Sequence, residues 1–249
     1  MIRLILIVIY LVFFGIFSLI ALPLLALLGK FKPLTRNKIA FKIVTDTFRV
    51  IRFLAGAKVT VIGKERIPED SAVLYIGNHR GFFDIIILYT LVPGLTGFVS
   101  KEEIKKVPIL NLWMVYMNCL FLNRKDVREG LKTILEGIEK MKSGISMCIF
   151  PEGTRSKGES EIDMLPFKEG SFKLAEKSGC PIVPVALRNT ANCLEKQFPR
   201  IRKTYVTVEF GEPIYMNELE KEDKKFIGAY TRNRIINLIY ALKKEYRLV

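Results

Sequence analysis

The first 56 residues combine a long apolar run with an amphipathic segment. From Leu4 to Gly29 no residue is charged, and at about 1.5 Å per residue a helix of that length exceeds a hydrocarbon core of about 30 Å. The run is too long for a cleaved signal peptide, and no small-residue cleavage site follows it. We therefore expect a retained membrane segment. Because Pro23 or Gly15 can kink a helix, the pattern leaves open whether it spans the bilayer or is re-entrant.

The amphipathic segment runs from Thr35 to Gly56. Its charged residues recur at steps of three and four, so they share one helical face, and apolar residues mostly occupy the others. The charged residues are Lys38, Lys42, Asp46, Arg49 and Arg52. Two interpretations stay open: a helix lying at an anionic bilayer surface, or an ordinary helix that packs its apolar side on the rest of the protein.

Beyond residue 56 the pattern changes to short apolar segments that alternate with helical periodicity. Strands are expected at Lys58 to Ile62, Ala72 to Gly77, Thr96 to Ser100, Cys119 to Asn123, Ser146 to Phe150, Ile182 to Leu187 and Tyr205 to Phe210. Helices are expected at Phe82 to Val92, Ile109 to Met117, Asp126 to Lys142, Glu169 to Ser178 and Asn217 to Tyr246. This alternation predicts an α/β domain with a mainly parallel, twisted sheet flanked by helices over residues 57–249, behind an anchoring segment over residues 1–56.

Composition narrows the class of protein. Half of the residues are apolar, which excludes a disordered chain, and the four cysteines and single histidine are too few for a disulfide scaffold or a Cys/His zinc site. The net charge of +14 favours either nucleic acid or an anionic membrane as partner. Nucleic acid is disfavoured, because the apolar anchor and interspersed acids show no basic groove motif.

The charge around the apolar run also predicts its orientation. Lys30, Lys32 and Arg36 follow the run, whereas Arg3 and the terminal amine precede it. Because the side with more basic residues stays inside, the following domain is expected on the cytoplasmic side of the cell membrane.

The only histidine lies directly after an apolar strand, in the segment NHRGFFD. His79 and Asp84 are five residues apart, which on a regular helix would turn them about 140° away from each other. They can meet only if His79 lies in the turn before the helix, and Gly81 makes such a turn easy. The pair would then form the general-base half of a catalytic triad, with the substrate supplying the hydroxyl. The alternative is a structural pair that caps the helix.

Two further polar clusters follow strands. FPEGTRS displays Glu152, Thr154 and Arg155 on a tight turn, where the carboxylate could bind a hydroxyl and the guanidinium a phosphate; a loop of solvated charges is the alternative. The segment NRK after NCLFL, together with Lys101 and Lys105, supplies cations for a phosphate cradle, although Lys105 and Lys125 individually fit simple surface solvation.

The blocks NHRGFFD, NCLFLNR, FPEGTRS and CPIVPVAL, in this order and at these separations, resemble those of the glycerolipid acyltransferases. The likeness covers roughly residues 57 to 215, includes the basic stretch KEEIKKVPILN, and is greatest to the bacterial 1-acyl-sn-glycerol-3-phosphate acyltransferases of the PlsC type. It implies a membrane-bound enzyme of phospholipid biosynthesis that converts lysophosphatidic acid into phosphatidic acid. The acyl donor would be acyl-CoA or an acyl carrier protein, with no cofactor and no metal.

The resemblance also implies residue roles. His79 would take the proton of the acceptor hydroxyl and Asp84 would orient it, while the hydroxyl oxygen attacks the thioester carbonyl. The other implied positions are Glu152, Gly153 and Thr154 on the loop that holds the acceptor, and Arg124 and Arg155, with Lys101 or Lys105, around its phosphate. The sequence does not identify the groups that bind the oxyanion, and backbone amides near Pro181 to Pro184 are a guess.

The sequence departs from the family at two positions. Gly81 stands where the family often has Ser, and Asn123 where Asp is common, so a hydroxyl contact and an acidic group are absent. Two alternatives to the main hypothesis stay open. One is acylation or transacylation of another lysophospholipid, and the other is a non-catalytic lipid-binding or membrane-shaping protein.

Overall fold

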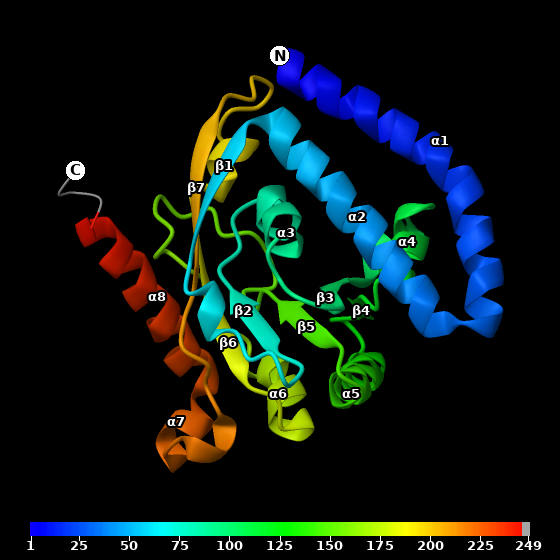
Figure 1. Cartoon of the computed structure of the whole chain (residues 1–249). Helices are drawn as coiled ribbons and strands as arrows, with labels where there is room; N and C mark the ends of the chain where they lie inside the picture. The colour runs from blue at the N-terminus through cyan, green and yellow to red at the C-terminus, as the bar shows by residue number, and fades with distance from the viewer. Residues whose placement is uncertain (246–249) are drawn as a thin grey trace.

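The computed structural model describes residues 1–245, and a seven-stranded sheet lies at its centre (Figure 1). The strands lie in the order β1-β7-β6-β2-β5-β3-β4. Their bounds are β1 Ala57–Ile62, β2 Leu74–Gly77, β3 Thr96–Lys101, β4 Leu120–Leu122, β5 Ser146–Ile149, β6 Ile182–Arg188 and β7 Thr204–Phe210. All neighbours run parallel except β6 and β7, which are antiparallel. The predicted α/β fold with a mainly parallel sheet is confirmed.

Helices cover both faces of the sheet, so its central strands are buried on both sides (Figure 1). One core lies against α3 (Phe82–Tyr89) and α4 (Leu110–Tyr116), and the other against α5 (Val127–Lys142), α6 (Lys173–Ser178) and α8 (Ile227–Glu245). In β2, Tyr75 enters the first core while Leu74 and Ile76 enter the second, as the alternation of side chains along a strand requires.

Three helix predictions need correction. The helix expected from Phe82 to Val92 ends at Tyr89, and the one expected from Glu169 begins as a 3₁₀ turn before α6. The long C-terminal helix expected from Asn217 is instead a 3₁₀ turn, the short α7 (Lys221–Lys225) and α8, and the expected end at Tyr246 lies outside the described residues. The break at Phe226 arises because the Glu169 carboxylate accepts the Gly228 N–H and caps the start of α8.

Two long helices at the N-terminus form an antiparallel pair along one side of the domain (Figure 1). The helices α1 (Ile2–Phe31) and α2 (Pro33–Ala55) are separated only by Lys32. Arg3 Nη1 donates to the Leu54 carbonyl at one end of the pair, and Trp113 of α4 donates to Ser18 Oγ further along α1. The helix α1 is therefore attached to the domain along its length.

The outward face of α1 is apolar and exposed. Among the described residues, α1 is the one helix long and apolar enough to cross a membrane, with a mean hydropathy of 3.0 in its most apolar window and 17% of that window buried. A core helix of a soluble protein would be mostly buried. The exposed apolar length of α1 indicates membrane association.

The apolar side of α2 packs inside the protein. Ala40, Val44 and Ile51 are buried, and the rings of Phe41 and Phe48 contact Tyr89 of α3. Of the two interpretations of this segment, these contacts favour the helix that packs its apolar side on the rest of the protein. The reason is that α1 and α3 cover the face that a bilayer would otherwise cover.

Candidate active site

The polar clusters found in the sequence follow strands whose carboxyl ends lie at one edge of the sheet. The strands β2, β5, β3 and β4 are successive parallel neighbours. The segments that begin at Asn78, Phe150 and Asn123 therefore emerge on the same side of the molecule, where parallel sheets carry their functional groups. Sequence separations of tens of residues become short distances in space here.

His79 and Asp84 are in direct contact. His79 lies in the turn before α3 and Asp84 in the first turn of that helix, and His79 Nδ1 is 2.7 Å from Asp84 Oδ2. The same Asp84 oxygen accepts the backbone N–H groups of Arg80 and Gly81, so its charge is held in place by three donors. The Asp84 side chain is fully buried, whereas the His79 side chain is 17% exposed. The geometry orients the ring by Nδ1 and leaves Nε2 for another partner.

Glu152 connects the FPEGTRS loop to the histidine. One of its oxygens accepts the His79 backbone N–H at 2.7 Å, and the other accepts the Leu165 backbone N–H at 2.9 Å. The residue is 3% exposed. Burial raises the pKa of the Glu152 carboxyl, and the two backbone donors oppose that rise. Because both oxygens already bind backbone, the arrangement suits positioning of His79 better than direct contact with an acceptor.

Neighbouring groups fix the His79 turn further. The imidazole stacks on the Phe150 ring with 4.3 Å between centroids, and Ser156 N–H donates to the His79 carbonyl. The Asn78 side chain exchanges two hydrogen bonds with the Leu187 backbone at the end of β6. The turn is thus held from three adjacent segments before any substrate arrives.

The structure gives Gly81 a different role from the one inferred from the sequence. Its backbone is extended, with φ −158°, a conformation that any residue adopts. A Cβ at this position would lie 2.6 Å from Glu195 Oε2, so Gly81 makes room for the Glu195 carboxylate. Glu195 accepts the Phe82 N–H and lies 3.3 Å from Arg155, whose guanidinium stacks over the Phe82 ring.

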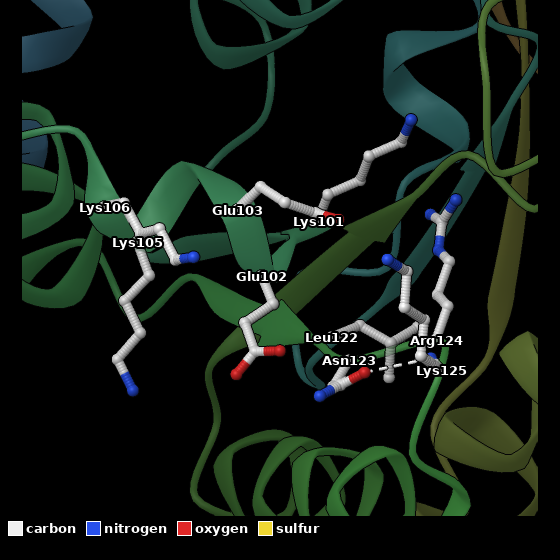
Figure 2. A pocket seen from close by; sticks show the side chains of 9 residues that line it. All are labelled: Lys101, Glu102, Glu103, Lys105, Lys106, Leu122, Asn123, Arg124 and Lys125. Carbon is white, nitrogen blue, oxygen red and sulfur yellow. Dashed lines mark hydrogen bonds between the residues drawn. The ribbon is translucent and has the colours of Figure 1, made fainter.

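The other expected cations, Lys101, Lys105 and Arg124, line an open groove of about 600 Å³ (Figure 2). The groove is lined by Lys101, Glu102, Glu103, Lys105, Lys106, Leu122, Asn123, Arg124 and Lys125. Figure 2 shows the Lys101 and Arg124 side chains extending toward the same end, with Lys105 at the other. The carboxylate of Glu103 is the charged group that acts on Arg124 in this groove. Arg155 does not line this groove.

Arg124 links the groove to the FPEGTRS loop, because its guanidinium donates to the Gly153 carbonyl. Gly153 has φ +74°, and a Cβ there would lie 2.8 Å from the Arg124 guanidinium. The positive φ favours a glycine at this position, and the missing side chain leaves room for the Arg124 guanidinium. Thr154, the next residue, is exposed.

The suggested oxyanion donors are wrong. Pro181 and Pro184 carry no N–H, the Ile182 N–H donates to the Ile214 carbonyl, and Pro184 pairs with Ile76 inside the sheet. This segment therefore lies away from the edge that holds His79. Among the described residues, no three His, Cys, Asp or Glu side chains gather as a metal ion would require.

Two residues near the site escaped sequence reasoning. Glu195 lies beyond the fourth block and reaches the start of α3 from the turn that follows the 3₁₀ segment Thr190–Cys193, and Lys168 comes close to Gly153. Neither belongs to a recognisable pattern. Only the absence of a side chain at Gly81, where the resembling family often has Ser, could have indicated that another group fills this space.

Comparison with known proteins gives a consistent picture. The family model described as Acyltransferase matches residues 58–188. A 1-acyl-sn-glycerol-3-phosphate acyltransferase of Borreliella burgdorferi is 30% identical over 83% of this chain and 81% of its own length, and one of Saccharomyces cerevisiae is 30% identical over 95% and 76%. The crystal structure of the 1-acyl-sn-glycerophosphate acyltransferase PlsC from Thermotoga maritima superposes with a TM-score of 0.72 at 25% identity, covering 97% of this chain and 98% of that one.

Proposed function

The chain belongs to the acyltransferase family, and from that membership we propose that it transfers an acyl group from a thioester donor to the free sn-2 hydroxyl of 1-acyl-sn-glycerol-3-phosphate. The product would be phosphatidic acid. The relatives with the same named activity cover most of this chain, which supports the substrate as well as the reaction type. The hypothesis of a non-catalytic lipid-binding protein is set aside, because the residues that the reaction needs are in contact.

The observation that carries the proposal is the His79–Asp84 pair. With Nδ1–H donated to Asp84, Nε2 of a neutral imidazole is the acceptor that a general base requires. As the acceptor hydroxyl attacks the thioester carbonyl, its proton passes to Nε2 and Asp84 stabilises the imidazolium. The tetrahedral intermediate then collapses, the C–S bond breaks, and the departing thiolate takes the proton from Nε2. Atoms and charge balance, and the base returns to its starting state.

The chain's own thiols do not take part in this scheme. Cys148 lies at the end of β5 and is fully buried, and burial raises the pKa of its thiol well above the usual value. A protonated, inaccessible thiol is a poor nucleophile. Direct transfer from donor to acceptor, without an acyl-enzyme, therefore fits the site.

In this proposal, the groove lined by Lys101 and Arg124 binds the phosphate group of the acceptor. Lys101 and Arg124 extend together at one end of it, and charge-assisted hydrogen bonds from these cations suit a phosphate. Arg124 also donates to the loop that holds Glu152, and Glu152 in turn holds His79. The phosphate-binding group and the base are thus connected through protein contacts. Glu152 is assigned a positioning role.

The exposed face of α1 is assigned to the membrane, with the domain on the cytoplasmic side. The basic residues at both ends of α1 support this side, because the cytoplasmic leaflet carries the anionic lipids that attract them. The contacts of α1 with α2 and α4 argue against a separate spanning helix, because a span across the bilayer would carry the charged face of α2 into hydrocarbon. The helix would lie in the interface, where an amphiphilic acceptor is concentrated.

The decisive experiment measures acyl transfer by purified, detergent-solubilised protein. Lysophosphatidic acid is supplied with acyl-CoA or with acyl carrier protein, and His79→Ala is assayed beside the parent. Phosphatidic acid from the parent and a loss of at least about 10³-fold in the variant would establish reaction and base together. If product formed only from a different lysophospholipid, that lipid and not lysophosphatidic acid would be the acceptor. Equal turnover by the parent and His79→Ala would overturn the mechanism.

A further inference from the structure

A second pocket, of about 720 Å³, lies where the N-terminus of α1, the end of α2 and the segment before β7 meet, at one end of the molecule (Figure 1). The pocket borders β1, and the phosphate groove borders β4. These strands are the two outermost strands of the sheet, so the pocket is separate from the phosphate groove. We call it the N-terminal pocket.

Three cations line the N-terminal pocket, and no carboxylate does. Arg3 comes from α1, Lys58 from β1, and Lys203 from the segment before β7. Strand pairing sets Lys58 beside Tyr205, and Lys203 Nζ lies 5.0 Å from the Tyr205 ring centre. None of the three cations forms an ion pair with a described residue, so bound negative charge would relieve their mutual repulsion.

The rest of the N-terminal pocket is apolar and open to the surroundings. Ile2, Leu6 and Phe53 are 75%, 43% and 80% exposed. They continue the exposed apolar face of α1, which is the surface assigned to the membrane. An apolar surface rimmed by unpaired cations matches the chemistry of a charged lipid, with acyl chains on one side and an anionic headgroup on the other.

We propose that the N-terminal pocket binds one anionic phospholipid of the bilayer, distinct from the substrate. Arg3, Lys58 and Lys203 would bind the headgroup phosphate, and Ile2, Leu6 and Phe53 would contact the acyl chains. The position of Arg3 is fixed in part by its hydrogen bond to the Leu54 carbonyl and by the small Gly56 beside it. Binding here would hold the α1–α2 pair against the start of the sheet in an anionic membrane.

The test counts lipids bound to the detergent-solubilised full chain by native mass spectrometry. Short-chain phosphatidylglycerol and phosphatidylcholine are titrated against the parent, the double variant Lys58→Gln/Lys203→Gln, and the control Lys142→Gln/Lys221→Gln. The control removes the same charge from α5 and α7, which lie at the opposite end of the molecule from this pocket (Figure 1). Because each basic residue near an anionic headgroup contributes about fivefold, we expect about thirtyfold weaker phosphatidylglycerol binding in the double variant and no change in the control.

Equal binding of the two lipids by the parent would overturn the proposal. So would phosphatidylglycerol binding by Lys58→Gln/Lys203→Gln that equals the parent's, or a similar loss in the control. Phe53→Ser gives a second arm, because this exposed side chain is dispensable for folding and its loss should still weaken lipid binding. Turnover of detergent-dispersed substrate is measured on the same samples and should stay at the parent value. A failed acyltransferase assay would leave the lipid count valid.

Discussion

The His79 turn and the Lys101 groove lie at the same edge of the sheet, yet they are held in opposite ways. Around His79 the Asp84 and Glu152 carboxylates are buried, and each accepts backbone N–H groups. Around Lys101 the cations are exposed, and the side chains of Lys101, Lys105 and Lys106 lie in an open groove. In the proposed mechanism, proton transfer would depend on a geometry fixed in advance, whereas phosphate binding would rely on charge that adjusts to the headgroup.

The largest effect should come from Asp84→Asn. The amide cannot stabilise an imidazolium as the carboxylate does, and it changes the partner of His79 Nδ1, so kcat should fall about 10³-fold with KM little changed. Steady-state kinetics checks this, with Asp46→Asn on α2 as a control that should match the parent. If a folded Asp84→Asn protein kept kcat within tenfold of the parent, the fixed geometry around His79 would not be needed for activity, and the contrast with the Lys101 groove would fail.

Glu152→Gln should have the next largest effect. The amide keeps one acceptor but turns its –NH₂ toward either the His79 or the Leu165 backbone N–H, so a hydrogen bond worth about 2 kcal/mol is lost and kcat falls about thirtyfold. A positioning role predicts that KM for lysophosphatidic acid is unchanged. If KM rose and kcat stayed constant, Glu152 would instead contact the acceptor directly.

Lys101→Ala should act mainly on KM. Loss of one charge-assisted contact to phosphate should raise KM for lysophosphatidic acid about tenfold and leave kcat within about twofold. The difference should shrink as salt is added, since exposed charges are screened. Lys106→Ala, at the other end of the same groove, should change KM less than about twofold. A larger rise in KM for Lys106→Ala than for Lys101→Ala would indicate that the phosphate binds at the Lys105 end of the groove.

The smallest effect concerns stability and pH. Burial raises the pKa of Glu152 above its usual value of 4.5, so the folded state binds this proton more tightly than the unfolded state does. The contribution of this bound proton to the free energy of unfolding is complete below pH 4.5 and is lost as pH rises through the raised pKa. The thermal stability of the parent relative to Glu152→Gln should therefore decline over that range. If the difference in thermal stability between the parent and Glu152→Gln stayed constant over this pH range, burial would not raise the pKa of Glu152.

The sequence predicted those features that follow from local pattern. Alternating apolar segments predicted the sheet, and the five-residue spacing with a following helix implied how His79 and Asp84 meet. The partner of Arg155 could not be predicted, because Glu195 is forty residues away and follows no periodicity. The same holds for the carboxylate of Glu169 at the start of α8. Contacts between distant segments depend on packing, which no local pattern encodes.

The position of β1 at the edge of the sheet bears on how the protein is made. β1 neighbours only β7, which is among the last elements synthesised, and the His79 turn needs Leu187 of β6 as the partner of Asn78. The apolar α1 leaves the ribosome long before β6 and β7 do. The nascent chain can therefore reach the membrane before its sheet closes, and the Asn78–Leu187 hydrogen bonds that hold the His79 turn form only after β6 has been synthesised.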